Sequence, residues 1–296
     1  MSARSVMRGD MVSDQSTMPF DGFASFYEEL GRKYPEEKLT YLTLGAQLRK
    51  RWILDQLRRL KGILLDAGCH KGLFCNRYRN GSVIGVDISP SLIATAKHRF
   101  PKVRFYVGDI RSMPFIENEF VDAVLCAETL EHIPDPEAAL NEFMRVLKPK
   151  GSLLLLVPDF AGTNRPAWVI KQEMTAYGIE ALPYFHTAYS PQELADLVSA
   201  IGFNVVYAGA GGHEAVYIRK RFVKIFNLAA LFSRRFTTTI IGRRIAFLLD
   251  LLFFSGLLCC GLRAMARRKA EHGYFSFVVA EKPLGVISSD EERPVP

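Results

Sequence analysis

The first regular hydrophobic pattern along the chain has a helical period. Between residues 21 and 60, apolar side chains recur mostly every three or four positions, and Pro35 divides the series into two parts. That spacing places the apolar side chains on one face of a helix, and a proline interrupts a helix. The pattern therefore predicts an N-terminal helical cap over residues 21–60, after a flexible polar tail over residues 1–20.

From residue 62 onward, short uninterrupted apolar runs replace this pattern and alternate with helical segments. The runs cover residues 63–65, 82–86, 103–107, 123–126, 153–157, 204–208 and 274–281. Such runs are typical of strands that are buried on both faces of a parallel sheet. Their alternation with helices predicts an α/β fold in which helices cover both faces of the sheet.

Three of the expected helices have recognisable first turns. Ser89 precedes Pro90, Asp135 precedes Pro136, and residues 190–193 read Ser-Pro-Gln-Glu, which is the form of a capping box. A serine or aspartate oxygen accepts a backbone N–H of the first turn, and proline fits the first helical position. These signals predict where three helices begin.

Glycines and aspartates follow the first three expected strands. The first run leads into Asp66, Gly68 and Gly72, the second ends at Asp87, and Asp109 follows the third. Ligands of open α/β sheets bind at the carboxyl ends of the strands, where a carboxylate can accept hydrogen bonds from a ribose diol. Each aspartate alone could equally be a helix cap or a turn residue. The series of three favours a nucleoside-containing ligand, although the Gly-x-Gly-x-x-Gly spacing of dinucleotide sites is absent.

With these motifs in order, residues 63–158 resemble the cofactor-binding core of class I S-adenosyl-L-methionine (SAM)-dependent methyltransferases. The likeness is strongest to the small-molecule subgroup that includes ubiquinone and menaquinone biosynthesis methyltransferases. The matching segments are LLDAGCHKG (64–72), VIGVDIS (83–89), GDIRSMPF (108–115), residues 120–158 and HTAYSPQELADLVSAIGF (186–203). The resemblance implies a Rossmann-like seven-stranded sheet, mostly parallel with an antiparallel last strand, and SAM as the cofactor.

The resemblance also implies which residues hold the cofactor. The glycine loop after the first strand would wrap the methionine moiety, and residues 126–128 would line the same moiety after the fourth strand. Asp87 would hold the ribose hydroxyls with Ile88 against the adenine, and Asp109 and Ile110 would read the adenine edge. The expected cofactor contacts are Asp66, Gly68, Cys69, Gly72, Asp87, Ile88, Asp109, Ile110, Cys126 and Ala127.

Two further sequence features concern the loops around the expected site. His70 stands where the family usually has a glycine, which makes this turn less permissive and directs an imidazole toward the cofactor or the substrate. Methyltransferases of nucleobase amino groups commonly resemble an Asn/Asp-Pro-Pro-aromatic motif after the fourth strand. Residues 126–129 read Cys-Ala-Glu-Thr instead, so a nucleic-acid substrate is disfavoured.

Methyl transfer is an in-line displacement for which the protein aligns the reactants and excludes water, and an acidic acceptor also needs a general base. The displacement itself requires no metal ion, and none is expected. The candidate bases are His132, after the fourth strand, and His186, in an expected substrate-side loop, with His70 as a further candidate. Each of them has a purely structural alternative, and Tyr184 and Tyr189 are as readily packing residues.

Charge is distributed unevenly along the 296 residues. Residues 219–269 contain twelve Lys or Arg and one acid, a net charge of +11, which leaves −4 for the rest because the total is +7. The basic character therefore belongs to one late segment. Five cysteines form no paired framework, and the first 20 residues have no apolar signal. These features predict a reducing, cytoplasmic location.

The basic segment lies in an expected helical insert, residues 211–272, between the sixth and seventh strands. Within it, residues 245–262 form an apolar stretch interrupted only by Asp250. We interpret the insert as a helical pair at the membrane interface, with arginines against anionic headgroups at the inner face. A single span is disfavoured because the seventh strand must return to the sheet. The alternatives are a lid or a dimer contact and, less well matched to the apolar residues, an RNA-binding face.

These features together predict a SAM-binding methyltransferase core over residues 61–210, a last core strand over 273–283 and a C-terminal tail over 284–296. The hypothesis for function is methyl transfer from SAM to a small, apolar or lipid-linked acceptor. Two alternatives stay open. One is a methyltransferase of a soluble metabolite, with the insert as a lid or dimer contact. The other is a non-catalytic SAM-binding protein tethered to a membrane. The oligomeric state is not predicted.

Overall fold

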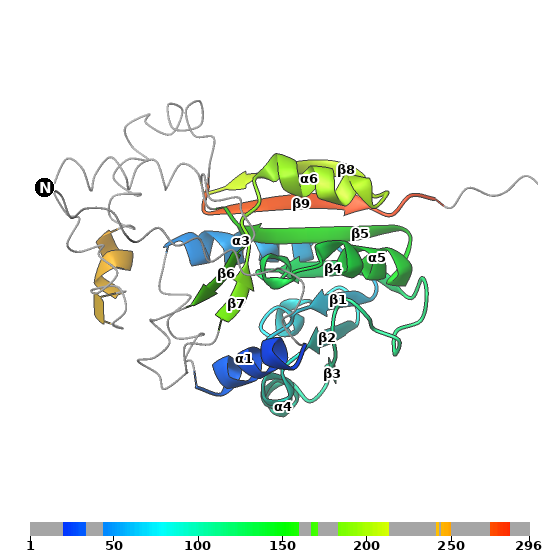
Figure 1. Cartoon of the computed structure of the whole chain (residues 1–296). Coiled ribbons are helices and arrows are strands. Elements are labelled where there is room, and N and C mark those ends of the chain that lie inside the picture. The colour runs from blue at the N-terminus through cyan, green and yellow to red at the C-terminus, as the bar shows by residue number, and fades with distance from the viewer. Residues whose placement is uncertain are drawn as a thin grey trace, which may run out of the picture.

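The computed structural model describes residues 20–33, 44–159, 167–170, 183–212, 241–242, 244–249 and 273–284. Its centre is a seven-stranded sheet with the order β3-β2-β1-β4-β5-β9-β8 (Figure 1). The strands are β1 (Leu64–Ala67), β2 (Val83–Asp87), β3 (Arg104–Val107), β4 (Val121–Ala127), β5 (Leu147–Pro158), β8 (Asn204–Gly211) and β9 (Phe275–Glu281). Strands β1 to β5 pair in parallel, and β9 runs antiparallel to β5 and β8. The predicted fold class is confirmed.

The central strands are buried on both faces, as their uninterrupted apolar runs predicted. Every residue of β1 and β2 is buried. The consecutive β5 residues Leu153 and Leu154 belong to separate core clusters, because successive side chains of a strand point to opposite faces. The strands β3 and β8 differ, since most of their residues are partly or fully exposed. They lie at the two edges of the sheet and have a neighbouring strand on one side only.

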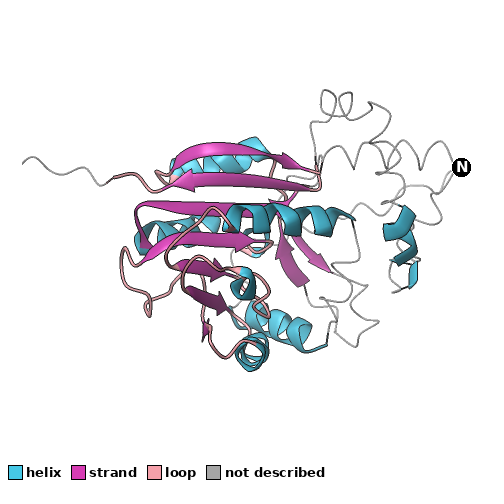
Figure 2. Cartoon of the chain, turned by 180° about the vertical axis from the view of Figure 1, so that it is seen from behind, coloured by secondary structure: helices cyan, strands magenta, loops and turns pink. Residues whose placement is uncertain are grey.

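Helices cover both faces of the sheet. The helices α5 (Pro136–Val146) and α6 (Pro191–Ala200) pack on one face, where Phe143 and Leu194 join one core cluster. The helices α3 (Leu44–Leu57) and α4 (Pro90–Arg99) contribute Ile53 and Ile93 to the other cluster. Figure 1 shows α5 and α6 in front of the sheet, and Figure 2 shows α3 across the opposite face. Helix α1 (Phe20–Lys33) contacts α4.

The three capping signals produce the predicted helix starts. Ser89 Oγ accepts from the Leu92 N–H at 3.3 Å, and Asp135 Oδ1 accepts from the Ala138 N–H at 3.1 Å. At α6, Ser190 Oγ accepts from the Glu193 N–H, and the Glu193 carboxylate accepts from the Ser190 N–H, which completes a capping box. Single 3₁₀ turns follow β1 and β4, namely η1 (Cys75–Arg77) and η2 (Leu130–His132).

A second, two-stranded sheet was not predicted. It pairs β6 (Ala167–Ile170) with β7 (Pro183–His186) in antiparallel register. His186, expected in a loop, is therefore the last residue of a strand. Residues 167–170 form a short apolar run, and such a run does not distinguish a strand from a helix by its period alone.

The predicted insert is described only in part. Residues 241–242 and 244–249 have helical backbone, while 213–240, 243 and 250–272 lie outside the described residues, as do the two tails at 1–19 and 285–296. Among the residues that are described, none of the helices has the length and apolar character needed to cross a membrane.

Candidate functional site

Three of the predicted site loops meet at the carboxyl ends of β1, β2 and β4. The N–H groups of Gly68 and Cys69 both donate to the Val86 carbonyl, at 2.8 and 2.9 Å. The carboxylate of Asp87 accepts from the His70 N–H at 2.8 Å and from the Ser89 N–H at 3.0 Å. The loop after β1 is thus fastened to the end of β2, where a nucleoside-containing ligand is expected.

Gly68 allows a close approach between the loop after β1 and the loop after β4. Its φ is +81°, and a Cβ at this position would lie 2.1 Å from Thr129 Oγ1, which belongs to the loop after β4. Only glycine tolerates both the conformation and this close approach. Gly72 and His70 also have positive φ values, +75° and +49°. His70 therefore adopts at some energetic cost the left-handed conformation that the family's usual glycine adopts freely.

Asp66 lies behind this loop and not at its surface. Its side chain is buried, and Cys75 Sγ donates to Asp66 Oδ2 at 3.1 Å. Burial raises the pKa of Asp66 to about 7, the negative charge of Asp87 adds to the rise, and the bond from Cys75 partly offsets it. This carboxyl therefore exchanges a proton near neutral pH, and the positive charge of a bound ligand would favour its ionised form.

The side chains of both predicted cysteines are enclosed within the fold. Cys69 and Cys126 are both buried free thiols, and Cys126 belongs to the main hydrophobic core. Burial raises the pKa of Cys126, so its side chain stays a neutral thiol. Ile110 is likewise a buried core residue. Ala127, the last residue of β4, is only partly buried.

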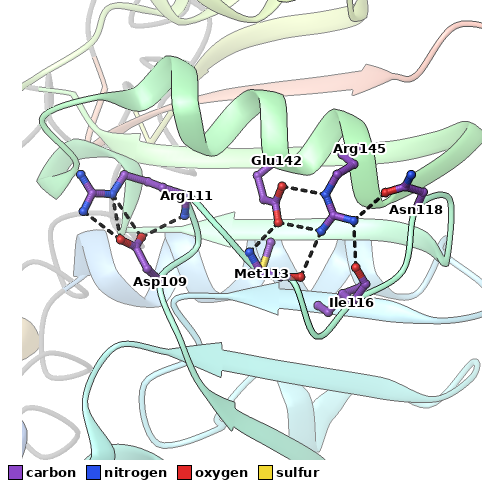
Figure 3. A network of polar contacts seen from close by, with 7 residues as sticks. All are labelled: Asp109, Arg111, Met113, Ile116, Asn118, Glu142 and Arg145. Carbon is purple, nitrogen blue, oxygen red and sulfur yellow. Dashed lines mark hydrogen bonds and ion pairs between the residues drawn. The ribbon is translucent and has the colours of Figure 1, made fainter.

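Asp109 is held by an ion pair within its own loop (Figure 3). Arg111 donates from Nε and Nη2 to the Asp109 carboxylate at 2.8 to 3.2 Å, and the Arg111 N–H donates to Asp109 Oδ1 at 2.9 Å. A carboxylate has about four acceptor positions, so a further bond to an adenine amino group is chemically compatible with this pair. The carboxylate is thereby fixed in place before any ligand binds.

The rest of that loop is pinned to α5 by Arg145 (Figure 3). Its guanidinium donates to the carbonyls of Met113 and Ile116 at 3.0 and 2.9 Å and to Asn118 Oδ1 at 2.7 Å. It also pairs with Glu142, whose carboxylate accepts the Met113 N–H. The bond from Arg145 lowers the pKa of Glu142 against the opposing effect of burial. The segment from residue 113 to 118, just beyond Asp109 and Ile110, is therefore rigidly placed.

The structure adds a residue that the sequence reasoning missed. Arg49, on α3, places Nε 3.3 Å from Glu128 Oε2. Glu128 directly follows β4 and has a φ of +58°, an uncommon conformation for a side chain other than glycine. Strained backbone of this kind is concentrated at functional sites. The helical period of α3 drew attention to its apolar face only, so nothing in the sequence singled out Arg49 among the neighbouring basic residues.

The structure also brings the segments of both candidate bases together. The Thr187 N–H, next to His186, donates to the carbonyl of Glu131, next to His132, at 2.8 Å. His132 Nε2 lies 3.6 Å from Glu131 Oε1, and the ring of Tyr27 on α1 lies 5.7 Å from the His132 ring between centroids. Tyr27 is a second residue that sequence reasoning missed. The side chains of His186 and Tyr184 lie outside the described residues.

Tyr189 behaves as a packing residue in this structure. It is only partly exposed and packs against the main hydrophobic core. Burial raises its pKa, and the carboxylates of Glu137, Glu131 and Glu193 raise it further. A phenol with a raised pKa remains protonated at neutral pH and is a poor general base.

These observations fit the cofactor that the resemblance implies. Gly68 lets the loops after β1 and β4 approach closely, Asp87 supplies a carboxylate at the end of β2, and Arg49 with Glu128 supplies one charge of each sign after β4. SAM carries a ribose diol and an amino-acid end with one ammonium and one carboxylate. The donor set and the ligand are therefore complementary, and the individual contacts stay predictions.

Comparisons with known proteins agree with the family that the sequence resembles. Residues 65–155 match a family model described as a methyltransferase domain. The chain is 30% identical to a demethylmenaquinone methyltransferase of Renibacterium salmoninarum over 168 residues, which are 55% of this chain and 68% of that protein. It is 28% identical to a trans-aconitate 2-methyltransferase of an Enterobacter species over 219 residues, 62% of this chain and 84% of that protein.

The fold comparison points the same way. The structure of Haemonchus contortus phosphoethanolamine N-methyltransferase 2 in complex with SAM has a TM-score of 0.52 and 16% sequence identity, and the match covers 88% of this chain and 60% of that one. At this level of identity the likeness concerns the fold alone.

Proposed function

This chain belongs to the class I SAM-dependent methyltransferases, and from that premise we propose that it methylates a small, apolar or lipid-linked acceptor. The family membership supplies the cofactor, SAM, and the reaction class. The acceptor class rests on one observation, a basic segment that carries an exposed apolar helix face.

For the cofactor, we assign each end of SAM to one set of side chains. Asp87 holds the ribose hydroxyls, and Asp109 with Ile110 reads the adenine edge. The Gly68 loop encloses the methionine moiety, with Arg49 toward its carboxylate and Glu128 toward its ammonium. The Arg49–Glu128 ion pair supports this assignment because its two charges match the two charges of the ligand. A guanidinium has five N–H donors, so a bond to Glu128 through Nε is compatible with a bond to a second carboxylate.

For the proton, His132 is the proposed general base. SAM supplies a methyl group on a sulfonium, which makes it electrophilic without further activation. An acceptor hydroxyl would lose its proton to one imidazole nitrogen of His132 as its oxygen forms the bond to the methyl carbon. The sulfur–methyl bond would break in the same step, with S-adenosyl-L-homocysteine as the leaving group. The adjacent Glu131 carboxylate orients the ring and stabilises its protonated form, and Tyr27 packs against the ring and excludes water. His186 is the second candidate base.

For the acceptor, the described part of the insert carries an exposed apolar stripe. Ile241, Ile245 and Leu248 are 70%, 38% and 61% exposed and follow one another at helical spacings of four and three residues. Arg244 lies between them and is exposed. An apolar face with flanking basic residues is typical of helices that lie at an anionic membrane surface. We propose such a peripheral contact at the cytoplasmic face, through residues 219–269, as a route for an apolar acceptor to the site.

A soluble acceptor is the second candidate, and a specific observation favours it. The Enterobacter relative, to which this chain is 28% identical, is named for methylation of trans-aconitate, a small polyacid. In that case the insert would serve as a lid or as a contact between subunits. A non-catalytic SAM-binding role, tethered to a membrane, is the third alternative.

The test is a transfer assay with methyl-labelled SAM. The purified protein is added to total cell extract, and the products are partitioned between organic and aqueous phases. Label in the organic phase supports the apolar acceptor, and label only in the aqueous phase contradicts it and favours the soluble metabolite. If calorimetry shows that SAM binds but no label passes from SAM to any acceptor in extracts of several sources, the non-catalytic alternative holds.

A further inference from the structure

Helix α1 packs closely against the start of α4, beside the expected ribose site. A Cβ placed on Gly31 would lie 2.6 Å from Leu92 Cγ, so the two helices approach one another at a distance that only glycine permits. Phe26, on the same helix, is buried. Figure 1 shows α1 lying alongside α4. The helix is thus part of the wall around the site.

Glu28 joins α1 to the first turn of α4. Its Oε2 atom accepts from Ser89 Oγ at 2.5 Å and from the Ser91 N–H at 3.0 Å. A carboxylate is stabilised at a helix N-terminus, because the first N–H groups of a helix have no partner within it. Burial raises the pKa of Glu28, but the bonds from Ser89 and Ser91 outweigh burial and hold the pKa below its usual value. The contact is therefore made by an ionised carboxylate.

Ser89 also connects Glu28 to Asp87, the residue proposed to hold the ribose. Ser89 donates its side-chain O–H to Glu28 and its backbone N–H to Asp87 Oδ1 at 3.0 Å. Asp87 Oδ2 in turn accepts from the His70 N–H in the glycine loop. A continuous series of hydrogen bonds thus runs from α1 through Ser89 and Asp87 to the loop after β1.

The neighbouring residue of α1 reaches a second loop of the site. Tyr27 lies with its ring 5.7 Å from that of His132, in the turn η2 after β4. Helix α1 also contacts β7, the strand that ends at His186. One turn of α1 therefore touches the proposed cofactor side at Ser89 and the proposed acceptor side at His132.

We propose that Glu28 is a positioning residue that couples the docking of α1 to the orientation of Asp87. With Glu28 in place, Ser89 and Asp87 are held for the ribose, and α1 covers the site with Tyr27 against His132. Without Glu28, the Asp87 carboxylate loses part of its fixed geometry and α1 detaches more readily. This inference rests on the proposed contact between Asp87 and the ribose, and the experiment below tests the two separately.

The experiment measures the binding of two ligands to three proteins by calorimetry. The ligands are S-adenosyl-L-homocysteine and its 2′,3′-dideoxy analogue, which lacks the ribose hydroxyls. Glu28→Ala is compared with the wild type and with Glu29→Ala, a matched control. Among the described residues, Glu29 pairs with Lys33 on the same helix and not with α4. We expect Glu28→Ala to bind S-adenosyl-L-homocysteine about tenfold more weakly than the wild type does. Its affinity for the dideoxy analogue should not fall, and Glu29→Ala should bind both ligands as the wild type does.

The outcomes separate the inference from the function on which it rests. If the wild type binds both ligands equally, the ribose contact of Asp87 is wrong and the coupling falls with it. If the wild type discriminates but Glu28→Ala loses both ligands equally, the ribose contact stands and the coupling is overturned. Glu28→Gln keeps an oxygen acceptor without the charge. Its affinity for S-adenosyl-L-homocysteine is expected to fall less, about threefold. If Glu28→Ala does not fold, Glu28→Gln is used for the comparison in its place.

Hydrogen exchange supplies a second readout. It measures how much the ligand slows exchange in α1, and a general loss of stability would not abolish this difference in one helix alone. In the wild type and in Glu29→Ala, S-adenosyl-L-homocysteine should slow amide exchange in residues 20–33. In Glu28→Ala the ligand should leave exchange in that helix unchanged. Equal slowing of exchange in all three proteins would overturn the coupling.

Discussion

At the scale of single residues, the site combines groups whose chemistry depends on their surroundings. Asp66, Gly68 and Asp87 were assigned from sequence by their places after strands. The structure adds that Asp66 is buried, that Gly68 faces Thr129, and that Asp87 already accepts two backbone N–H groups. Two predictions follow from these environments, one for Asp66 and one for Arg49.

Asp66 should make the stability of the fold depend on pH. Its pKa is about 7 in the folded protein against 3.8 for an unperturbed aspartate, so folding takes up a proton between these values. Its contribution to stability is complete below about pH 4 and is lost as the pH rises through 7. Asp66→Asn removes this dependence. Thermal unfolding at pH 5 and pH 8 should show a smaller drop in Tm for Asp66→Asn than for the wild type.

The control for this prediction is Asp55→Asn, because Asp55 is a partly exposed aspartate on α3 that pairs with Arg58. It should keep the pH dependence of the wild type. Parallel pH profiles for the wild type and Asp66→Asn would contradict the raised pKa. The same variant is expected to bind SAM more weakly, because an amide cannot offer a negative charge to the ligand.

Arg49 should recognise the carboxylate of SAM and no other part of it. Arg49→Gln is expected to weaken SAM binding about tenfold and to leave the binding of decarboxylated SAM unchanged. Arg51→Gln is the control, because Arg51 lies on the same helix with its side chain 82% exposed. Calorimetry with the two ligands measures both effects. An equal loss for both ligands would mean that Arg49 only stabilises the loop after β4.

At the scale of elements, local signals predicted where helices begin, while packing decided where the helices lie. The caps at Ser89, Asp135 and Ser190 involve contacts within three residues, so the sequence contains all of the information. The docking of α1 on α4 and the pair β6–β7 depend on residues far apart in sequence. The loop after β3 is of the same kind, because one residue of α5 holds it.

Arg145 should therefore control the order of that loop. Arg145→Met removes the bonds to Met113, Ile116 and Asn118 and leaves Glu142 without its cation. We expect a loss of about 2 to 4 kcal/mol in the free energy of unfolding, since buried partners are left unsatisfied. Denaturant unfolding measures it. Arg99→Met, a change on the surface of α4, should cost much less, and equal losses would contradict the role of Arg145.

At the scale of the whole molecule, the order of the sheet brings residues that are far apart in sequence to one edge, formed by the carboxyl ends of β1, β2 and β4. Strands β1, β2 and β4 are neighbours in the sheet, although their carboxyl ends lie at residues 67, 87 and 127 of the sequence. Helices α1 and α3 reach the same edge from the N-terminal region, through Glu28 and Arg49. The late insert carries the exposed stripe of Ile241, Ile245 and Leu248.

That stripe should contact an anionic membrane surface. Ile241→Ser/Leu248→Ser is expected to reduce cosedimentation with phosphatidylglycerol-containing vesicles at least tenfold, because burying an aliphatic side chain is worth about 1.5 to 3 kcal/mol. Val206→Ser is the control, since Val206 is 56% exposed on the edge strand β8. Binding to vesicles of phosphatidylcholine alone should be weak for every protein.

A different result would identify the alternative role of the insert. If vesicle binding does not change in the double variant, the stripe does not contact lipid. Size-exclusion chromatography with light scattering then shows whether the same substitutions dissociate a dimer. A lid role would instead change acceptor KM with no effect on either measurement.

The sequence by itself determined the fold class, the strand positions of the main sheet, the helix caps and the chain positions of the glycine loop and the three aspartates. These depend on local periodicity, capping and short motifs, and each of these signals involves residues that are close together in the sequence. Only the tertiary structure brought Arg49 to Glu128, Tyr27 to His132 and Glu28 to Ser89. Those pairs are separated by 61 to 105 residues in the sequence, so no local pattern encodes them, and only the packing of the N-terminal helices on the sheet creates them.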